Sequence, residues 1–205
     1  MIELYISALI TFFVVIDPPG CAPIYAGLTS RAGIAERRTM AIRAVGVAAA
    51  ILLVFALFGE KLLKGLGIEL ASFRIAGGVM LFLIALEMVF EKRTQRREDR
   101  AASITPEEAE DVSIFPMAMP MIAGPGSIAS VMLLMARNDG LERSLVVLAA
   151  LATILLLTLA ALLAAGPLMR LLGHKIEAVI TRLLGVLLAA LAVQFVIDGV
   201  LEQIR

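Results

Sequence analysis

Two stretches of the sequence combine residues that break a helix with residues that bind ligands. The first, DPPGC, covers Asp17–Cys21, and the second, GPGS, covers Gly124–Ser127. Proline lacks a backbone N–H and clashes with the preceding turn, so we expect each stretch to unwind a helix. Unwound backbone inside a membrane normally lines a cavity within the protein. Both breaks are therefore candidate binding sites.

The half-helices that begin after these breaks suit the two ends of a zwitterion. Helix N-termini present unpaired N–H groups and a partial positive charge, which suits a carboxylate. Asp17 supplies a negative charge for an ammonium group, and the glycines let a ligand approach the backbone closely. The candidate binding residues are Asp17, Pro18, Gly20 and Cys21 at the first break and Gly124, Pro125, Gly126 and Ser127 at the second.

Asp17 also has a structural interpretation and a coupling interpretation. A charged residue at the centre of a membrane helix costs about 2.5–3.5 kcal/mol, so it needs a ligand or an ionic partner. Arg43, Arg74 and Arg182 are the candidate partners for a structural salt bridge. A carboxylate in an empty low-dielectric cavity favours its protonated form, and an arriving ammonium would expel that proton. Asp17 is therefore the candidate for proton coupling, which we favour over sodium.

The composition is that of a multi-spanning membrane protein. Hydrophobic residues make up 60% of the 205 residues, and six apolar segments are each about as long as a membrane-spanning helix. They cover residues 3–29, 39–59, 71–90, 113–136, 144–167 and 178–200. The 18 basic residues balance the 18 acidic ones, which gives no reason to expect nucleic acid as a partner. With one cysteine and one histidine, we expect neither a metal site nor a cofactor.

The two halves of the chain resemble each other, which indicates a duplication. Pro19-Gly20 recurs as Pro125-Gly126, and Arg74 near the start of the third apolar segment recurs as Arg182 near the start of the sixth. Because each half has three spans, the second half must insert upside down, and paired broken helices in such repeats point to a transporter's binding site.

We therefore predict an all-α integral membrane protein with one membrane domain, residues 1–205, built from two inverted three-helix repeats. The repeats cover 1–90 and 113–205, and the first and fourth helices are broken. A polar cytoplasmic linker, 91–112, joins them, and its charges are expected to be solvated. Within it, Thr105–Glu108 has the N-cap, proline and glutamate of a helix start.

The two breaks resemble the motifs of a known family. DPPGCAP at Asp17–Pro23 is similar to the DPxGxxP motif of the MarC family, and Pro116–Ile128 is similar to its second motif. The resemblance covers the whole chain and implies an inner-membrane carrier of glycine, alanine and similar small neutral amino acids, working by alternating access. The alternatives are an exporter of another small solute, a metal ion or a drug, or a membrane protein without transport activity. We do not expect an enzyme, because Cys21 is alone and His174 lies in a loop.

Basic residues predict the orientation in the membrane. If the N-terminus is outside, twelve of the 18 lysines and arginines lie at inner loops and six at the outer face. Residues 31–38 and 91–112 are then cytoplasmic and both termini are outside. Labelling of single cysteines with an impermeant maleimide tests this: residues near Gln203 should react from outside the cell. Labelling from the cytoplasmic side alone would contradict the orientation.

Overall fold

The computed structural model describes residues 1–102, 111–138 and 140–204, and this part of the chain is helical without strands. The helices are α1 (Ile2–Ile16), α2 (Pro18–Leu28), α3 (Ile34–Gly65), α4 (Leu70–Val89), α5 (Lys92–Ala102), the irregular segment η2 (Ser113–Ile122), α6 (Pro125–Arg137), α7 (Leu141–Leu163) and α8 (Ala165–Ile204). The prediction of an all-α protein is confirmed.

Within the described residues, five helical segments are long and apolar enough to cross a membrane. They are Ile2–Leu28, Ile34–Gly65, Leu70–Val89, Leu141–Leu163 and Ala178–Ile204. A sixth span is formed if η2 and α6, which are bent by 52° at their junction, count as one. Each of the six apolar segments predicted from the sequence coincides with one of these spans.

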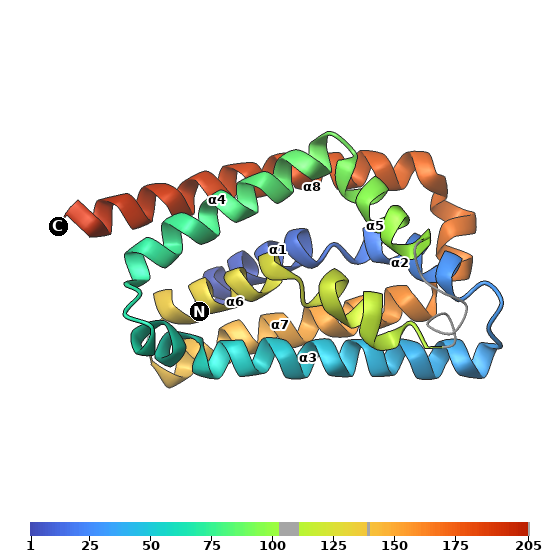
Figure 1. The fold of residues 1–205 in the computed structure, drawn as a ribbon, viewed down its shortest axis with the longest axis horizontal. Helices are drawn as coiled ribbons and strands as arrows, with labels where there is room; N and C mark the ends of the chain where they lie inside the picture. The colour runs from blue at the N-terminus through green and yellow to red at the C-terminus, as the bar shows by residue number, and fades with distance from the viewer. Residues whose placement is uncertain (103–110, 139, 205) are drawn as a thin grey trace.

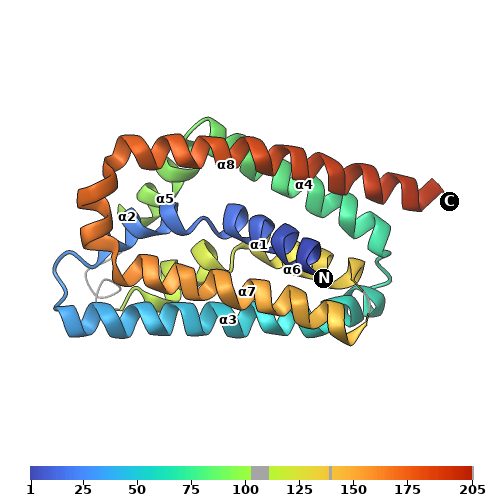
Figure 2. The same cartoon turned by 180° about the vertical axis from the view of Figure 1, so that it is seen from behind.

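The helices lie in three layers, with the broken helices in the middle (Figures 1 and 2). In both views, α4 runs beside α8 on one side, and α3 runs beside α7 on the other. The broken pairs α1–α2 and η2–α6 lie between these layers, and both chain ends lie at the opposite end of the molecule from α5. Corresponding helices of the two halves are therefore neighbours. An inverted duplication requires such an arrangement, and the repeat itself stays a prediction.

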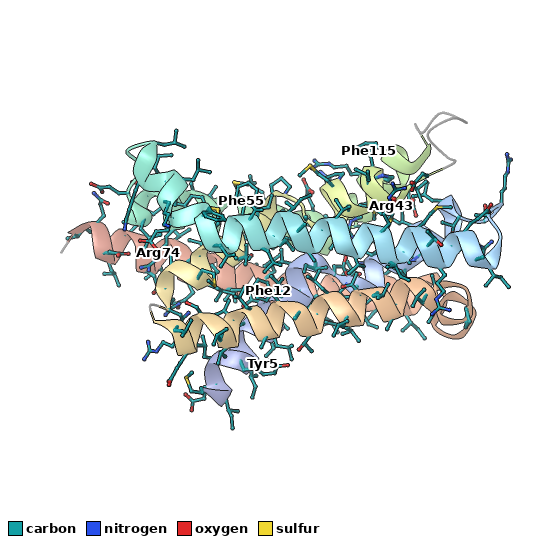
Figure 3. All side chains as sticks on the ribbon, turned by 90° about the horizontal axis from the view of Figure 1, so that it is seen from below. Tyr5, Phe12, Arg43, Phe55, Arg74 and Phe115 are labelled. Carbon is teal, nitrogen blue, oxygen red and sulfur yellow. The ribbon has the colours of Figure 1, made fainter. Side chains whose placement is uncertain are left out.

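The middle layer is held by apolar packing on both sides. The side chain of Phe12 in α1 is fully buried in a cluster with Leu52 of α3 and Ile154 of α7, and the view from below shows it behind the gap between these two helices (Figure 3). On the other face of α1, Val14 and Val15 pack in a second cluster with Leu81 of α4 and Phe195 of α8. The two clusters bury the last turn of α1, Val14–Ile16, and Asp17 after it, so the first break lies inside the protein.

Small residues let α4 and α8 approach closely, as is common between membrane helices. A Cβ atom on Gly78 would lie 2.8 Å from the backbone oxygen of Ala192 and 2.7 Å from Cγ2 of Val196. A Cβ atom on Gly185 would lie 3.1 Å from the backbone oxygen of Ala85. The α4–α8 layer therefore depends on these glycines.

We predict that Gly78→Ala lowers the free energy of unfolding by about 1–3 kcal/mol, because the added methyl group overpacks the α4–α8 contact. The matched control is Gly46→Ala in α3, where a Cβ atom would meet nothing within 4 Å. This change should be neutral or stabilising by up to about 1 kcal/mol, because alanine favours a helix over glycine. Thermal unfolding of both variants in detergent measures the difference. Equal stability of the two would contradict the proposed packing.

Candidate functional site

The first break is confined to Asp17. This residue has left-handed backbone angles, φ 59° and ψ 65°, a region that aspartate tolerates better than most residues. Its N–H still makes the last helical hydrogen bond, to the carbonyl oxygen of Phe13, and its left-handed angles then end α1. Pro18 then begins α2 at once, because proline suits the first position of a helix. The expected unwinding at Pro18 and Gly20 is therefore wrong, since both belong to the first turn of α2.

The carboxylate of Asp17 caps α2 and forms a buried ion pair. Oδ1 accepts a hydrogen bond from the N–H of Gly20 at 3.1 Å, and Oδ2 lies 3.0 Å from Nη1 of Arg97. Asp17 is 1% exposed and Arg97 is 7% exposed, so the pair is shielded from water. A Cβ atom on Gly20 would lie 2.2 Å from Oδ2, so only glycine leaves room for this pair. The Asp17 carboxylate at the first break thus already has its partners within the protein, the N–H of Gly20 and the guanidinium of Arg97.

The partner of Asp17 is not one of the three arginines considered from the sequence. Arg43 pairs with Asp111, Arg74 with Glu202, and Arg182 with Glu91. Arg97 comes instead from α5, within the stretch expected to be a solvated linker. For Arg97 that expectation is wrong, because α5 turns back against the protein and buries this side chain. The helix start predicted at Thr105–Glu108 lies outside the described residues.

A second arginine of α5 covers the end of α1. Nη2 of Arg93 donates to the carbonyl oxygen of Val15 at 2.7 Å, and Nη1 lies 2.9 Å from the sulfur of Met88. The last carbonyls of a helix lack intrahelical partners, so this contact satisfies one of them. Burial and the neighbouring Arg97 lower the pKa of the Arg93 guanidinium to about 10, which leaves it charged at neutral pH.

The second break is longer and leaves a helix N-terminus open. Phe115 and Met119, each followed by a proline, have extended backbone angles, so the chain stays irregular through η2. Gly124 then caps α6 without any side-chain hydrogen bond among the described residues, and Pro125 occupies the first helical position. A Cβ atom on Gly124 would lie 2.4 Å from the carbonyl oxygen of Pro120, so this turn requires glycine. Unlike α2, α6 therefore presents uncapped N–H groups.

The two breaks meet at Val15 and Gly126. A Cβ atom on Gly126 would lie 3.3 Å from Cγ1 of Val15 and 2.7 Å from Cδ1 of Ile84. The start of α6 thus lies against the last turn of α1, where Arg93 also binds. The two breaks therefore lie close together, although they are more than 100 residues apart in the sequence.

A cavity of about 290 Å³ opens where these elements meet. Its polar lining comes from the first turn of α6, from α5 and from the end of α4. The charged residues on its wall are Glu87, Arg93, Arg96 and Arg97, and the second break contributes Gly124, Pro125, Gly126 and Ser127. Glu87 and Arg96 form an ion pair at 2.7 Å, and Glu87 is only partly exposed. The cavity thus combines opposite charges with an open helix N-terminus.

The cavity divides the eight residues predicted as binding residues into two groups. Gly124–Ser127 line it, whereas Asp17, Pro18, Gly20 and Cys21 of the first break are not part of its lining. Cys21 is buried, with its sulfur 3.5 Å from the carbonyl oxygen of Ile16. In this conformation Asp17 binds Arg97 in the place where a cargo ammonium was expected.

Sequence reasoning missed the four charged residues of the cavity wall. For the three arginines of the wall, the sequence did hold a clue. In the run from Lys92 to Arg100, Arg93, Arg96, Arg97 and Arg100 follow a helical spacing of three and four residues. A row of this kind places arginines on one helix face. A charged run is usually solvated, however, and its contact with the first break depends on packing between distant parts of the chain.

Comparison with known proteins gives a consistent family match. A family model described as "MarC family integral membrane protein" matches residues 2–204. The chain is 37% identical to a UPF0056 membrane protein of Methanocaldococcus jannaschii, covering 97% of both chains. It is also 32% identical to the UPF0056 inner membrane protein YhgN of Escherichia coli K12, covering 95% of both chains. No solved structure matches.

We predict that Arg97→Gln and Asp17→Asn each lower the free energy of unfolding by about 3–5 kcal/mol, because each leaves one buried charge without its partner. The double variant should lose less than the sum of the two changes, since it removes both charges. Arg38→Gln, at an exposed position of α3, is the control and should have little effect. Unfolding in mixed micelles measures all four. Strictly additive losses would show that the two residues are not coupled.

Proposed function

Because the chain belongs to the MarC family of integral membrane proteins, we propose that it is a secondary transporter of small neutral amino acids, such as glycine and alanine, in the inner membrane. The observation that carries this proposal is the cavity at the second break, where a carboxylate, arginines and an open helix N-terminus line one small space. The cargo crosses without chemical change.

The charges of the cavity suit both ends of an amino acid. Its carboxylate binds Arg96 and the N–H groups of Gly126 and Ser127 at the start of α6. Its ammonium binds Glu87, which takes the role that the sequence had suggested for Asp17. When the cargo is absent, Arg96 and Glu87 neutralise each other at 2.7 Å. Binding is then an exchange of partners, in which each charge replaces the internal ion pair with a charge of the cargo.

The size of the cavity favours a small side chain. At about 290 Å³ it lies at the lower end of the range of ligand pockets, roughly 300–1,000 Å³. Its apolar wall includes Val15, Ile84 and Met121. A hydrogen atom or a methyl group on the cargo has room beside these side chains.

Ion pairs at both ends of the molecule provide the two gates that alternating access requires. At the α5 end, Asp17–Arg97 and Glu87–Arg96 hold α5 against α2 and α4. At the other end, Arg137 of α6 lies 3.0 Å from Asp198 of α8, and Arg74 of α4 pairs with Glu202 of α8. Figure 3 shows Arg74 toward the opposite end of the protein from Arg43. We propose that α5 lies on the cytoplasmic side. Breaking the ion pairs at the α5 end then exposes the cavity to the cytoplasm, and breaking those at the other end exposes it to the outer face.

We predict that Glu87→Gln weakens the binding of alanine by about 2–5 kcal/mol, because the cargo ammonium loses its charged partner. Arg143→Gln, at an exposed position at the start of α7, is the control and should bind alanine like the native protein. Titration calorimetry on the purified protein measures both. An unchanged affinity in Glu87→Gln would exclude this residue from the site, and the absence of alanine binding in the native protein would refute the proposed cargo.

We further expect coupling to protons rather than sodium, with Asp17 as the residue that exchanges the proton when its pair with Arg97 opens. Uptake of labelled alanine into proteoliposomes should follow an imposed pH gradient, and Asp17→Asn should abolish that response. Arg38→Gln, reconstituted in parallel, should keep it. Uptake that follows a sodium gradient alone would contradict proton coupling, and a full pH response in Asp17→Asn would reject Asp17.

A further inference from the structure

The charges around the cavity do not cancel. Two of its three arginines face a carboxylate: Arg96 lies 2.7 Å from Glu87, and Arg97 lies 3.0 Å from Asp17. Arg93 instead contacts two neutral acceptors, the carbonyl oxygen of Val15 and the sulfur of Met88. In the part of the chain that the structure describes, no carboxylate lies within 4.0 Å of Arg93. Arg93 therefore has no carboxylate in direct contact, and the charges of Asp17 and Glu87 act on it only from further away.

The start of α6 adds further anion-binding groups beside this charge. Gly124 provides no side chain to cap the helix, so the first N–H groups of α6 are open. Ser127 lines the cavity and is only 3% exposed, and among the described residues no hydrogen bond of its hydroxyl group is found. This hydroxyl is therefore available to a ligand or a water molecule in the cavity.

Val15 brings Arg93 and the start of α6 together. Nη2 of Arg93 is 2.7 Å from the carbonyl oxygen of Val15, and a Cβ atom on Gly126 would be 3.3 Å from its Cγ1. The guanidinium group and the helix N-terminus thus lie on either side of one residue. Both favour negative charge, and their effects add at this point.

A neutral amino acid does not remove the excess charge. Its carboxylate and ammonium groups replace the internal Arg96–Glu87 pair, and the sum of charges in the cavity stays the same. We propose that the cavity also binds a small monovalent inorganic anion, of the size of chloride, between Arg93 and the Ser127 hydroxyl, which leaves the N–H groups of Gly126 and Ser127 to the cargo carboxylate. The anion site stands on these residues alone, and its link to amino acid binding rests on the proposed function.

The link has a defined sign. An anion beside Arg93 compensates the excess charge and lets Arg96 turn to the cargo carboxylate, so anion and amino acid favour each other. Binding linkage is reciprocal, so chloride should raise the affinity for alanine by the factor by which alanine raises the affinity for chloride. We expect this factor to be about 5- to 150-fold, the range of typical coupling between sites.

The test uses the purified full-length protein in detergent at constant ionic strength. Sodium chloride is titrated against the sodium salt of morpholinoethanesulfonate, a bulky anion, and the unfolding temperature is recorded with and without alanine. Native protein should show a saturable rise with chloride, as expected for a ligand that binds the folded state. Arg93→Gln and Ser127→Ala should lose or weaken that rise, whereas Arg93→Lys, which keeps the charge, should retain part of it. Arg143→Gln is the matched control and should respond like the native protein.

The possible outcomes test the anion site, its link to amino acid binding and the proposed cargo separately. A native protein with the same unfolding temperature in both salts, or an Arg93→Gln variant that responds like the native protein, would overturn the anion site. Alanine binding that is independent of chloride would overturn the link while leaving the proposed function intact. Chloride stabilisation without any alanine binding would refute the proposed cargo but support the anion site. If Arg93→Gln does not fold, Arg93→Lys and Ser127→Ala still decide the matter.

Discussion

The buried ion pair between Asp17 and Arg97 is the constraint on which the rest of this structure depends. Proline and aspartate in the middle of an apolar helix would leave a carboxylate and broken backbone inside the membrane protein, which is costly without polar partners. Arg97 supplies the charge, and Gly20 supplies both an N–H donor and the space for the contact. This pair also holds α5 against the helix layers. The arginines of α5 can therefore line a cavity rather than face water.

The ion pair makes the two breaks chemically different. At the first break the Asp17 side chain caps α2, so that helix start is already occupied. At the second break Gly124 has no side chain to do the same for α6, and its N–H groups remain open beside Arg93 and Arg96. We propose that one break provides the gate contact and the other provides the binding groups. The difference comes from the residue before the first proline of each helix, which is Asp17 at α2 and Gly124 at α6.

The sequence predicted the spans and the breaks well, because both follow from local physics. Apolar runs of sufficient length identified six spans, and proline with glycine located the interruptions near Asp17 and Gly124. The sequence did not reveal that a new helix begins directly at Pro18, because this depends on the backbone conformation of Asp17 alone. It also did not identify Arg97 as the partner of Asp17. The two residues are 80 positions apart and meet through packing alone, while the charges of α5 have the pattern of a solvated segment.

We propose above all that the cavity between α4, α5 and α6 binds both charged ends of a small amino acid. The most direct measurement compares the affinity of the purified protein for alanine, for propionate, which lacks the ammonium, and for ethylamine, which lacks the carboxylate. A site that pairs both groups rejects analogues that lack either one, because a buried charge is then left without a partner. The account predicts that alanine binds and that both analogues bind at least tenfold more weakly, a difference of about 1.4 kcal/mol or more. Equal affinity for alanine and propionate would contradict it.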